Sequence, residues 1–332
     1  MVNFTQTKII INADDLGFSP SVNSAILHCA EQGTVTAASV MVNMPFAEEA
    51  LSQIQQRTPP LSLALHFTLT SGKPVSPPQD VPLLVDTDGL FRLGFLGLWQ
   101  TLASKKRPAL LAQIQTELSA QLRLMDQLTE KYQCCFNHLD SHQHIHALPG
   151  IWELLQREAT QRHLPLRVPR EQWGTLHRCS HRYWSWFPQG LLKQAILHRC
   201  LHHVPQTIGY FGILETGRMD SSALLKIFQS VGKNSTFDLY EINTHPSALA
   251  EDHEGTVCCS EADKKFHLSF WREKEFQALK SNNILSWAQQ YNIILTGFPI
   301  ACNHPHANEG EKHVHERRDV REGEGSLGES PK

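Results

Sequence analysis

Short apolar runs alternate with segments of helical spacing along most of this chain of 332 residues. A run rich in β-branched residues is typical of a strand buried on both faces, and an intervening helix predicts parallel pairing with the next strand. Right-handed crossovers then bring the carboxyl ends of all strands to one face, so we expect an α/β fold with a parallel sheet or barrel. The expected strands are Lys8–Ala13, Thr36–Val42, Leu61–Leu69, a strand beginning at Phe136, Leu164–Arg170, Thr236–Asn243 and Asn292–Thr296.

The segments between these strands are of three kinds. Residues 72–108 are rich in Pro, Gly and isolated aromatic residues, so we expect an excursion over one face rather than part of the core. Gly209–Arg218 is expected to be a loop, and the polar chain beyond about Ala301 is expected to be disordered. The remaining segments are expected to be helices, namely Ser21–Gly33, Phe46–Gln56, Ala109–Tyr132, a helix beginning at Ile151, Leu191–Leu201 and Ser221–Ser230.

Polar side chains gather where the expected strands end. Asp14 and Asp15 follow the first strand, His66 lies near the end of another, and His245 directly follows a third. If chance had placed these residues, about half of them would fall at the opposite ends of strands or inside helices. Their shared position predicts that they meet at one face of the sheet.

The stretch Phe136–His146 holds four of the chain's 19 histidines, together with Asp140. Because it is poor in apolar residues, we expect it to lie outside the core, as a strand that runs into a strand-to-helix loop. Imidazole and carboxylate groups are the ligands of Zn²⁺, Fe²⁺, Mn²⁺ and Ni²⁺, and less often of Mg²⁺. The sequence therefore predicts a metal site at the carboxyl ends of the strands.

Each of these groups also has a purely structural explanation. Asp14 and Asp15 have the residue type that caps the following helix, and His66 has the position of a partly buried histidine with an ordinary hydrogen bond. The Phe136–His146 stretch has the composition of a solvated loop with adventitious affinity for metals. His245, which precedes Pro246, has the position of a residue that only ends a strand.

Composition limits the partners of the chain. Hydrophobic residues make up 41% of the sequence, and 30 Lys and Arg against 33 Asp and Glu give a net charge of −3. With no long basic stripe, we expect neither nucleic acid nor a membrane as a partner. The first residues lack the regions of a signal peptide, no apolar run is long enough to span a bilayer, and the eight cysteines have no CxxC spacing. We therefore expect a cytoplasmic protein with reduced thiols and a small or neutral partner.

Several segments match, in chain order, the motifs of one known family. They are Asn12–Gly17, Leu65–Thr70 with Gly72–Pro74, His138–His146, Thr244–Pro246 and Arg272–Leu279. This order resembles the YdjC-like carbohydrate deacetylases, which include chitooligosaccharide deacetylases. The conjunction of motifs is specific although each motif alone is weak. The sequence departs from the family at Leu16, where many members carry Phe, at Ser247, where many carry Gly, and in the tail after Ala301.

The resemblance implies a single-domain deformed (β/α) barrel over residues 1–300, followed by the polar tail, residues 301–332. It also implies the roles of the residues at the strand ends. Asp14 would be the general base and His245 the general acid, and the metal ligands would be Asp15, His66 and His142.

The resemblance further implies one divalent ion, most simply Mg²⁺, although the ligand types also suit Zn²⁺ or another first-row metal. The substrate would be an N-acetylated sugar, and a homodimer is compatible with the sequence. We expect Asp140 and the remaining histidines to support the ligating imidazoles. Arg170 and Trp173 are candidates for contact with a sugar ring.

Three functions compete at this point. The first is a metal-dependent hydrolase that removes N-acetyl groups from an amino sugar or a chitooligosaccharide. The second is a metal-dependent hydrolase of another bond, such as a sugar phosphoester. The third is a sugar-binding protein without catalytic activity on the same fold.

Overall fold

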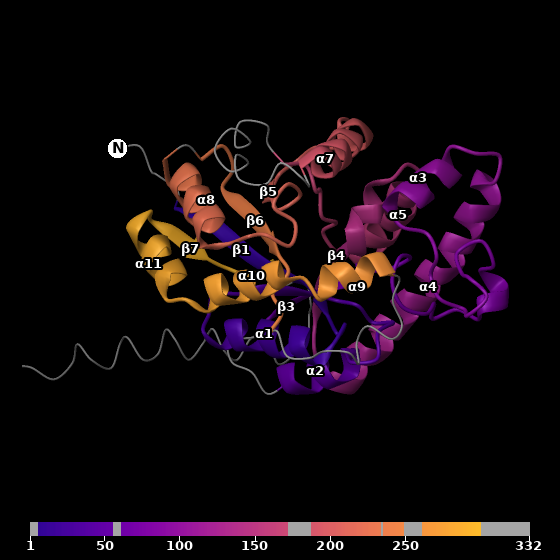
Figure 1. Ribbon diagram of the computed structural model, residues 1–332, viewed down its shortest axis with the longest axis horizontal. Helices are drawn as coiled ribbons and strands as arrows, with labels where there is room; N and C mark the ends of the chain where they lie inside the picture. The colour runs from indigo at the N-terminus through magenta and orange to yellow at the C-terminus, as the bar shows by residue number, and fades with distance from the viewer. Residues whose placement is uncertain (1–5, 56–60, 172–186, 234, 249–260, 300–332) are drawn as a thin grey trace, which may run out of the picture.

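The computed structural model describes residues 6–55, 61–171, 187–233, 235–248 and 261–299. Its centre is a curled parallel sheet with helices packed around it, so the predicted single-domain (β/α) barrel-like fold is confirmed (Figure 1). The strand order is β4-β3-β2-β1-β6-β5, and β7 pairs with β1. The strands are β1 (Thr7–Leu16), β2 (Ala37–Val40), β3 (Ser62–Phe67), β4 (Phe136–Ser141), β5 (Gly209–Phe211), β6 (Leu239–Thr244) and β7 (Ile293–Leu295).

Helices connect the strands and cover the sheet (Figure 1). The helices predicted from apolar spacing are all present, with ends that differ by a few residues. The α-helices are α1 (Pro20–Glu31), α2 (Ala47–Ile54), α3 (Phe95–Leu102), α4 (Arg107–Tyr132), α5 (Ile151–Arg162), α7 (Phe187–Leu201), α8 (Ser221–Lys233), α9 (Glu261–His267), α10 (Phe270–Lys280) and α11 (Asn283–Gln290). Two short 3₁₀ segments are η1 (Pro78–Asp80) and η2 (His142–Ala147).

Strand β1 is the centre of the sheet because it pairs with three other strands. It pairs with β6 over Lys8–Ala13 and with β7 over Thr7–Ile9. Its pairing with β2 is interrupted by a register shift between Ala13 and Leu16. Asp14 and Asp15 lie in this interruption, beyond the last pair with β6, so they leave the regular ladder at the carboxyl end of the strand.

Helix α1 begins without help from the two aspartates. Ser19 is its N-cap residue, and the Ser19 hydroxyl accepts a hydrogen bond from the Val22 N–H at 3.3 Å. Pro20 occupies the first turn, where its missing N–H costs nothing. The explanation of Asp14 and Asp15 as the cap of this helix is therefore wrong.

Three local predictions were wrong. Residues 72–108 contribute to the core, because α3 and the irregular chain before it bury apolar side chains, whose spacing has no single period. Leu164–Arg170 forms no strand and makes only one bridge, between Leu166 and Leu139 of β4. Gly209–Arg218 is not wholly a loop, because β5 lies within it. The buried side chains of residues 72–108 include Val81, Leu84, Phe91, Phe95, Leu98 and Leu102.

The described cysteines include both free thiols and a disulfide-bonded residue. Cys29, Cys134 and Cys200 are free thiols, as expected, whereas Cys135 is disulfide-bonded, so the expectation of reduced thiols is wrong there. Within the described chain, no helix has the length and apolar character needed to cross a bilayer. The predicted tail, residues 301–332, lies outside the described residues, so the division at residue 300 stays a prediction.

Gly17 is a position in this fold where a side chain would be both strained and crowded. It has φ +96°, and a Cβ atom there would lie 2.8 Å from the Ala47 Cα at the start of α2. We expect Gly17→Ala to lower the free energy of unfolding by about 2–4 kcal/mol, since strain from the left-handed backbone adds to overpacking. Gly33 has φ +72° and open space around it. Gly33→Ala should cost only about 1–2 kcal/mol, from the backbone alone. Urea denaturation of both variants measures the difference, and equal losses would contradict the close approach at Ala47.

Candidate active site

The polar residues predicted at the strand ends do meet at the carboxyl face of the sheet. β1 delivers Asp14 and Asp15, β3 delivers His66, and His245 directly follows β6. His142 follows β4 as the first residue of η2. All five side chains are buried, with residue exposures of 6% or less. The parallel topology, rather than proximity in sequence, brings these groups together.

Asp15 lies between two imidazoles. Its Oδ1 atom is 3.5 Å from Nε2 of His66 and 3.8 Å from Nε2 of His142. The other ring nitrogens are held elsewhere: Nδ1 of His66 contacts Asp140 Oδ1 at 2.7 Å, and Nδ1 of His142 contacts the Thr70 hydroxyl at 2.6 Å. These contacts fix the orientation of both rings, so that each Nε2 atom faces Asp15.

This arrangement fits a cation. Oδ1 of Asp15 and Nε2 of His66 are buried and have no hydrogen-bond partner among the described residues. Two ligands at about 2.1 Å from one ion lie at most about 4.2 Å apart, and both contacts of Asp15 Oδ1 fall within that limit. Burial without a partner is costly for such groups, so a bound ion would remove a penalty that the protein otherwise bears.

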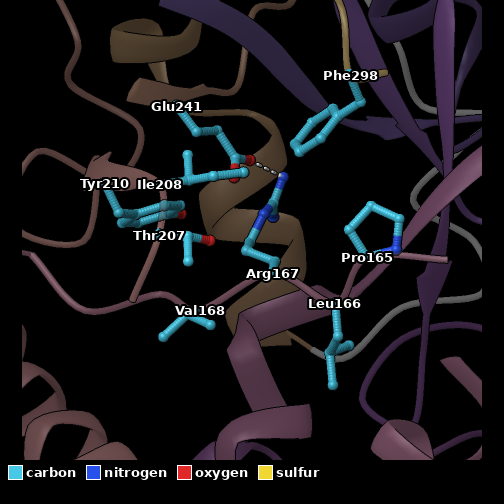
Figure 2. Close-up of a pocket in the computed structure, with 9 residues that line it drawn as sticks. All are labelled: Pro165, Leu166, Arg167, Val168, Thr207, Ile208, Tyr210, Glu241 and Phe298. Carbon is cyan, nitrogen blue, oxygen red and sulfur yellow. Dashed lines mark ion pairs between the residues drawn. The ribbon is translucent and has the colours of Figure 1, made fainter. Parts of the chain in front are cut away.

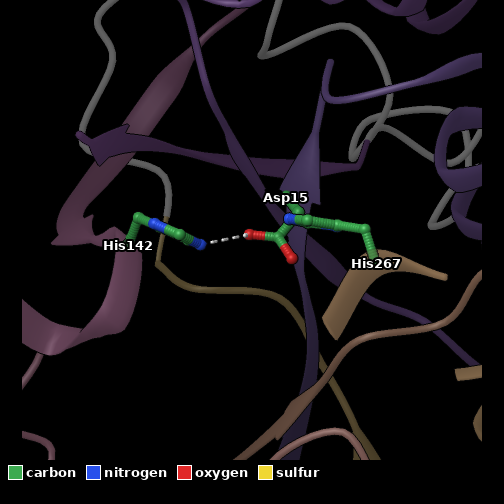
Figure 3. A group of neighbouring side chains, drawn as sticks. All are labelled: Asp15, His142 and His267. Carbon is green, nitrogen blue, oxygen red and sulfur yellow. Dashed lines mark ion pairs between the residues drawn. The ribbon is translucent and has the colours of Figure 1, made fainter. Parts of the chain in front are cut away.

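A second grouping includes a residue that sequence reasoning missed. Asp15, His142 and His267 each place one possible ligand atom within 4.8 Å of the others (Figure 3). Asp14, His66 and Asp140 do the same. His267 is the last residue of α9 and belongs to no motif that we recognised. A lone histidine at a helix end carries no local signal that could have identified it.

The two carboxylates create a strong negative field at this point. Burial by itself raises the pKa of Asp15, but neighbouring His66, Arg272 and His142 outweigh it and hold that pKa well below its usual range. Burial lowers the pKa of His66, yet the charges of Asp14 and Asp140 outweigh it and raise that pKa to about 10. The Asp15 carboxylate is therefore kept ionised, and positive charge is stabilised on the His66 ring beside it.

Arg167 is the hub that holds Asp14 in place. Its Nη1 and Nη2 atoms donate to the two carboxylate oxygens of Asp14 at 3.1 and 3.0 Å. Nη2 also lies 2.7 Å from Asp140 and 2.6 Å from Glu241. Figure 2 shows Arg167 reaching across a pocket to Glu241, with Tyr210 and Phe298 among the lining side chains. One buried guanidinium thus forms ion pairs with three carboxylates, which come from β1, β4 and β6.

His245 lies on the other side of Asp14. Its Nε2 atom is 3.8 Å from Asp14 Oδ2, and its backbone N–H donates to the buried carboxylate of Glu275 in α10. Burial lowers the pKa of His245 to about 4, although Asp14 and Asp15 act in the opposite direction. The imidazole is therefore neutral near pH 7, and it must gain a proton before it can act as an acid.

Arg272, within the segment that resembles a late family helix, completes the neighbourhood of Asp15. Its Nη1 atom donates to Asp15 Oδ2 at 3.0 Å and also to Nδ1 of His267. The Arg272 residue is fully buried. Asp15 is therefore oriented by an arginine on one oxygen, while its other oxygen faces the two imidazoles.

The other histidines of the stretch are buried and packed among neighbouring side chains. The expectation that the stretch lies outside the core is wrong, as is its explanation as a solvated loop, because β4 is buried throughout. His138 stacks on Phe298 at 3.7 Å between ring centroids, and His146 lies between the Ser141 hydroxyl and the Arg167 carbonyl. A polar strand tolerates burial here because its polar groups are largely satisfied by neighbours.

Two further expectations concern contact with a sugar. Arg170 donates to the Leu201 carbonyl and to Gln206, so its side chain is tied to the end of α7 rather than to the site. Trp173 lies outside the described residues. Asp140 holds the His66 ring, as expected for a residue that supports a ligand.

Comparisons with known proteins show which family the chain belongs to. The sequence profile of the YdjC-like protein family matches residues 8–290. The chain belongs to the YdjC-like family. A carbohydrate deacetylase from Thermoanaerobacter pseudethanolicus is 28% identical over 292 residues, which cover 88% of this chain and 98% of the relative. A carbohydrate deacetylase from Brevibacillus brevis is 37% identical over 162 residues, or 49% of this chain. A chitooligosaccharide deacetylase from Proteus mirabilis is 36% identical over the same length.

The extent of these matches differs. This chain spans 59% of the Brevibacillus and Proteus relatives of the YdjC-like family. A crystal structure of a proposed cellobiose-phosphate cleavage protein from Enterococcus faecalis V583 has a TM-score of 0.64 at 22% identity. It covers 88% of this chain and 97% of the Enterococcus chain, and at this identity it supports the fold alone.

The Arg167 hub should dominate the stability of this YdjC-like protein. Arg167→Met leaves Asp14, Asp140 and Glu241 buried without their cation, so we expect a loss of about 3–5 kcal/mol in the free energy of unfolding. Arg162 is the matched control, since it pairs with Asp126 at 2.7 Å but keeps 28% of its side chain exposed. Arg162→Met should cost about 1 kcal/mol or less. Chemical denaturation compares the two, and similar losses would contradict the role of the hub.

Proposed function

We propose that this protein is a metal-dependent hydrolase that removes N-acetyl groups from an amino sugar or a chitooligosaccharide. The observation that carries the proposal is the convergence of Asp15, His66 and His142, with Asp14 and His245 beside them. The names of the related deacetylases support the same reaction and a carbohydrate as the partner.

Asp15, His66 and His142 would hold one divalent ion. The resemblance to the family favours Mg²⁺, while one carboxylate and two imidazoles also suit Zn²⁺ or another first-row ion. When bound, a divalent cation lowers the pKa of water and polarises the acetyl carbonyl. The chain's own residues then have to orient the substrate and move one proton.

Asp14 is the proposed general base. Arg167 fixes both of its oxygens, and the Asn12 side chain donates to Oδ1 at 2.8 Å, so the carboxylate cannot rotate freely. Asp14 would accept a proton from water as the water oxygen bonds to the acetyl carbon. A base held in a fixed position in this way avoids the entropic cost of finding the proton.

His245 is the proposed general acid. It would give a proton to the nitrogen as the carbon–nitrogen bond breaks, so that acetate and a free amine leave with one water consumed. Asp14 Oδ2 lies 3.8 Å from His245 Nε2, which gives the proton taken up by Asp14 a short route to the imidazole. One proton would then serve both steps.

A cytoplasmic location belongs to the same proposal, and so does a homodimer. The described helices are compatible with a cytoplasmic location, since none could span a bilayer. Size-exclusion chromatography with light scattering would give the number of chains in the particle. A particle mass of one chain would contradict the homodimer.

Release of acetate from N,N′-diacetylchitobiose tests the proposed reaction. We expect turnover by the wild-type protein, loss of turnover on chelation, and recovery when a divalent ion is returned. Asp14→Asn keeps the size of the side chain but removes the base, so kcat should fall by about 10²- to 10⁴-fold. Asp126→Asn is the control, because Asp126 lies on α4 with half of its side chain exposed, and it should keep wild-type activity.

The same assay separates the competing functions. Release of phosphate from phosphorylated sugars without release of acetate would favour hydrolysis of a phosphoester. Binding of the acetylated disaccharide without any turnover would favour a sugar-binding protein. Either result, or acetate release that survives both chelation and Asp14→Asn, would overturn the deacetylase proposal.

A further inference from the structure

His267 is held rigidly beside the candidate metal site, yet neither the motifs nor the proposed reaction gives it a role. The residue is 4% exposed, and its ring stacks on Phe18 with 3.3 Å between centroids and 13° between planes. Its Nδ1 atom contacts the Arg272 guanidinium, which also binds Asp15. Stacking and hydrogen bonding together fix both the plane and the rotation of the imidazole.

The contact with Arg272 determines which nitrogen of His267 carries hydrogen. A guanidinium has only donors and is always charged, so Nδ1 of His267 has to accept. The proton of the neutral ring is then on Nε2. This Nε2–H is buried and has no hydrogen-bond partner among the residues that the structure describes. An orphaned buried donor is rare and costly in a folded protein, which indicates that its acceptor arrives from outside the chain.

The position of the ring shows where that acceptor would be. One ring nitrogen of His267 lies within 4.8 Å of a ligand atom of Asp15 and of His142, and the His267 ring is nearly parallel to that of His142 at 6.3 Å. Figure 3 shows His267 pointing toward Asp15 from the side opposite His142. Since Nε2 carries hydrogen and Nδ1 accepts from Arg272, neither ring nitrogen of His267 offers a lone pair to a metal in this arrangement. Nε2 is a donor at the rim of the metal site.

We propose that the Nε2–H of His267 donates a hydrogen bond to the acyl oxygen of the substrate. This inference rests on the proposed deacetylase function and adds a residue that contacts the reacting group. As the water oxygen bonds to the acetyl carbon, the π electron pair of the carbonyl moves onto its oxygen, which becomes an oxyanion. A donor that is already oriented by Arg272 and Phe18 stabilises that charge without reorganisation.

Two amide substitutions separate the role of the His267 Nε2–H as a donor from the role of the ring in the contact with Arg272. In His267→Asn the amide can keep the contact with Arg272, but no atom reaches the position of Nε2. In His267→Gln the amide N–H can reach that position. With metal-loaded full-length protein and N,N′-diacetylchitobiose, we expect His267→Asn to lower kcat by about 10²- to 10³-fold with little change in KM. His267→Gln should recover at least a tenth of the wild-type kcat.

Two readouts that do not depend on turnover accompany the kinetics. The metal content per chain, measured by elemental analysis, should be the same in both variants and the wild type. Acetate, which carries the acyl oxygens of the product, should bind the metal-loaded wild type and His267→Gln in calorimetry at least ten times more tightly than His267→Asn. Thermal unfolding of each variant shows whether a loss of activity accompanies a loss of folded protein.

The outcomes are distinct. Metal loss in both variants would make His267 a ligand and overturn the inference. Equal losses of kcat in His267→Asn and His267→Gln would mean a structural role and would also overturn it. If the wild-type protein releases no acetate, the proposed function fails, and acetate binding then tests the role of His267 by itself. Weaker acetate binding in His267→Asn alone supports His267 as a donor. Equal acetate binding in all three proteins contradicts that role.

Discussion

Two aspartates buried side by side at the end of β1, Asp14 and Asp15, are each paired with a buried arginine. Arg167 holds Asp14 and Arg272 holds Asp15, and these partners lie 153 and 257 positions away in the sequence. Desolvation of a carboxylate costs several kcal/mol unless a cation and hydrogen bonds compensate it. The rest of the site depends on this compensation, because it allows acidic groups to be buried at the carboxyl face of the sheet. In such a water-poor environment their interaction with a cation is strongest.

The backbone around the site is strained where the candidate ligands lie. Asp15 has φ 71°, and Gln143 and His144, which directly follow His142, have φ 56° and 58°. Non-glycine residues adopt this left-handed conformation at a cost, and they persist in it only where the surroundings impose it. Here the strain redirects the chain at the ends of β1 and β4, so that Asp15 and His142 face each other instead of following the strands outward.

Much of this could be predicted from the sequence, because its determinants are local. The alternation of apolar runs and helical spacing gave the order of elements, and the position of Asp14, Asp15, His66 and His245 at strand ends placed them on one face. The arginines were missed for a physical reason. Arg272 lies in a helix, where an arginine ordinarily points to solvent, and only tertiary packing brings it to Asp15. The burial of β4 was missed for a related reason, since polar side chains indicate exposure unless their partners are known.

The pairing of β1 with three other strands has a consequence for the folding of the chain during synthesis. The ribosome releases β1 first, but two of its neighbours, β6 and β7, begin only at Leu239 and Ile293. Until then the central strand lacks one whole edge of its ladder, and Asp15 has no guanidinium beside it. The amino-terminal half therefore stays incomplete, and exposed to incorrect pairing, until the last third of the polypeptide has been made. Contacts between residues so far apart in sequence also make folding slow. A factor that shields this half on the ribosome would protect the unpaired edge of β1 until β6 and β7 have been made.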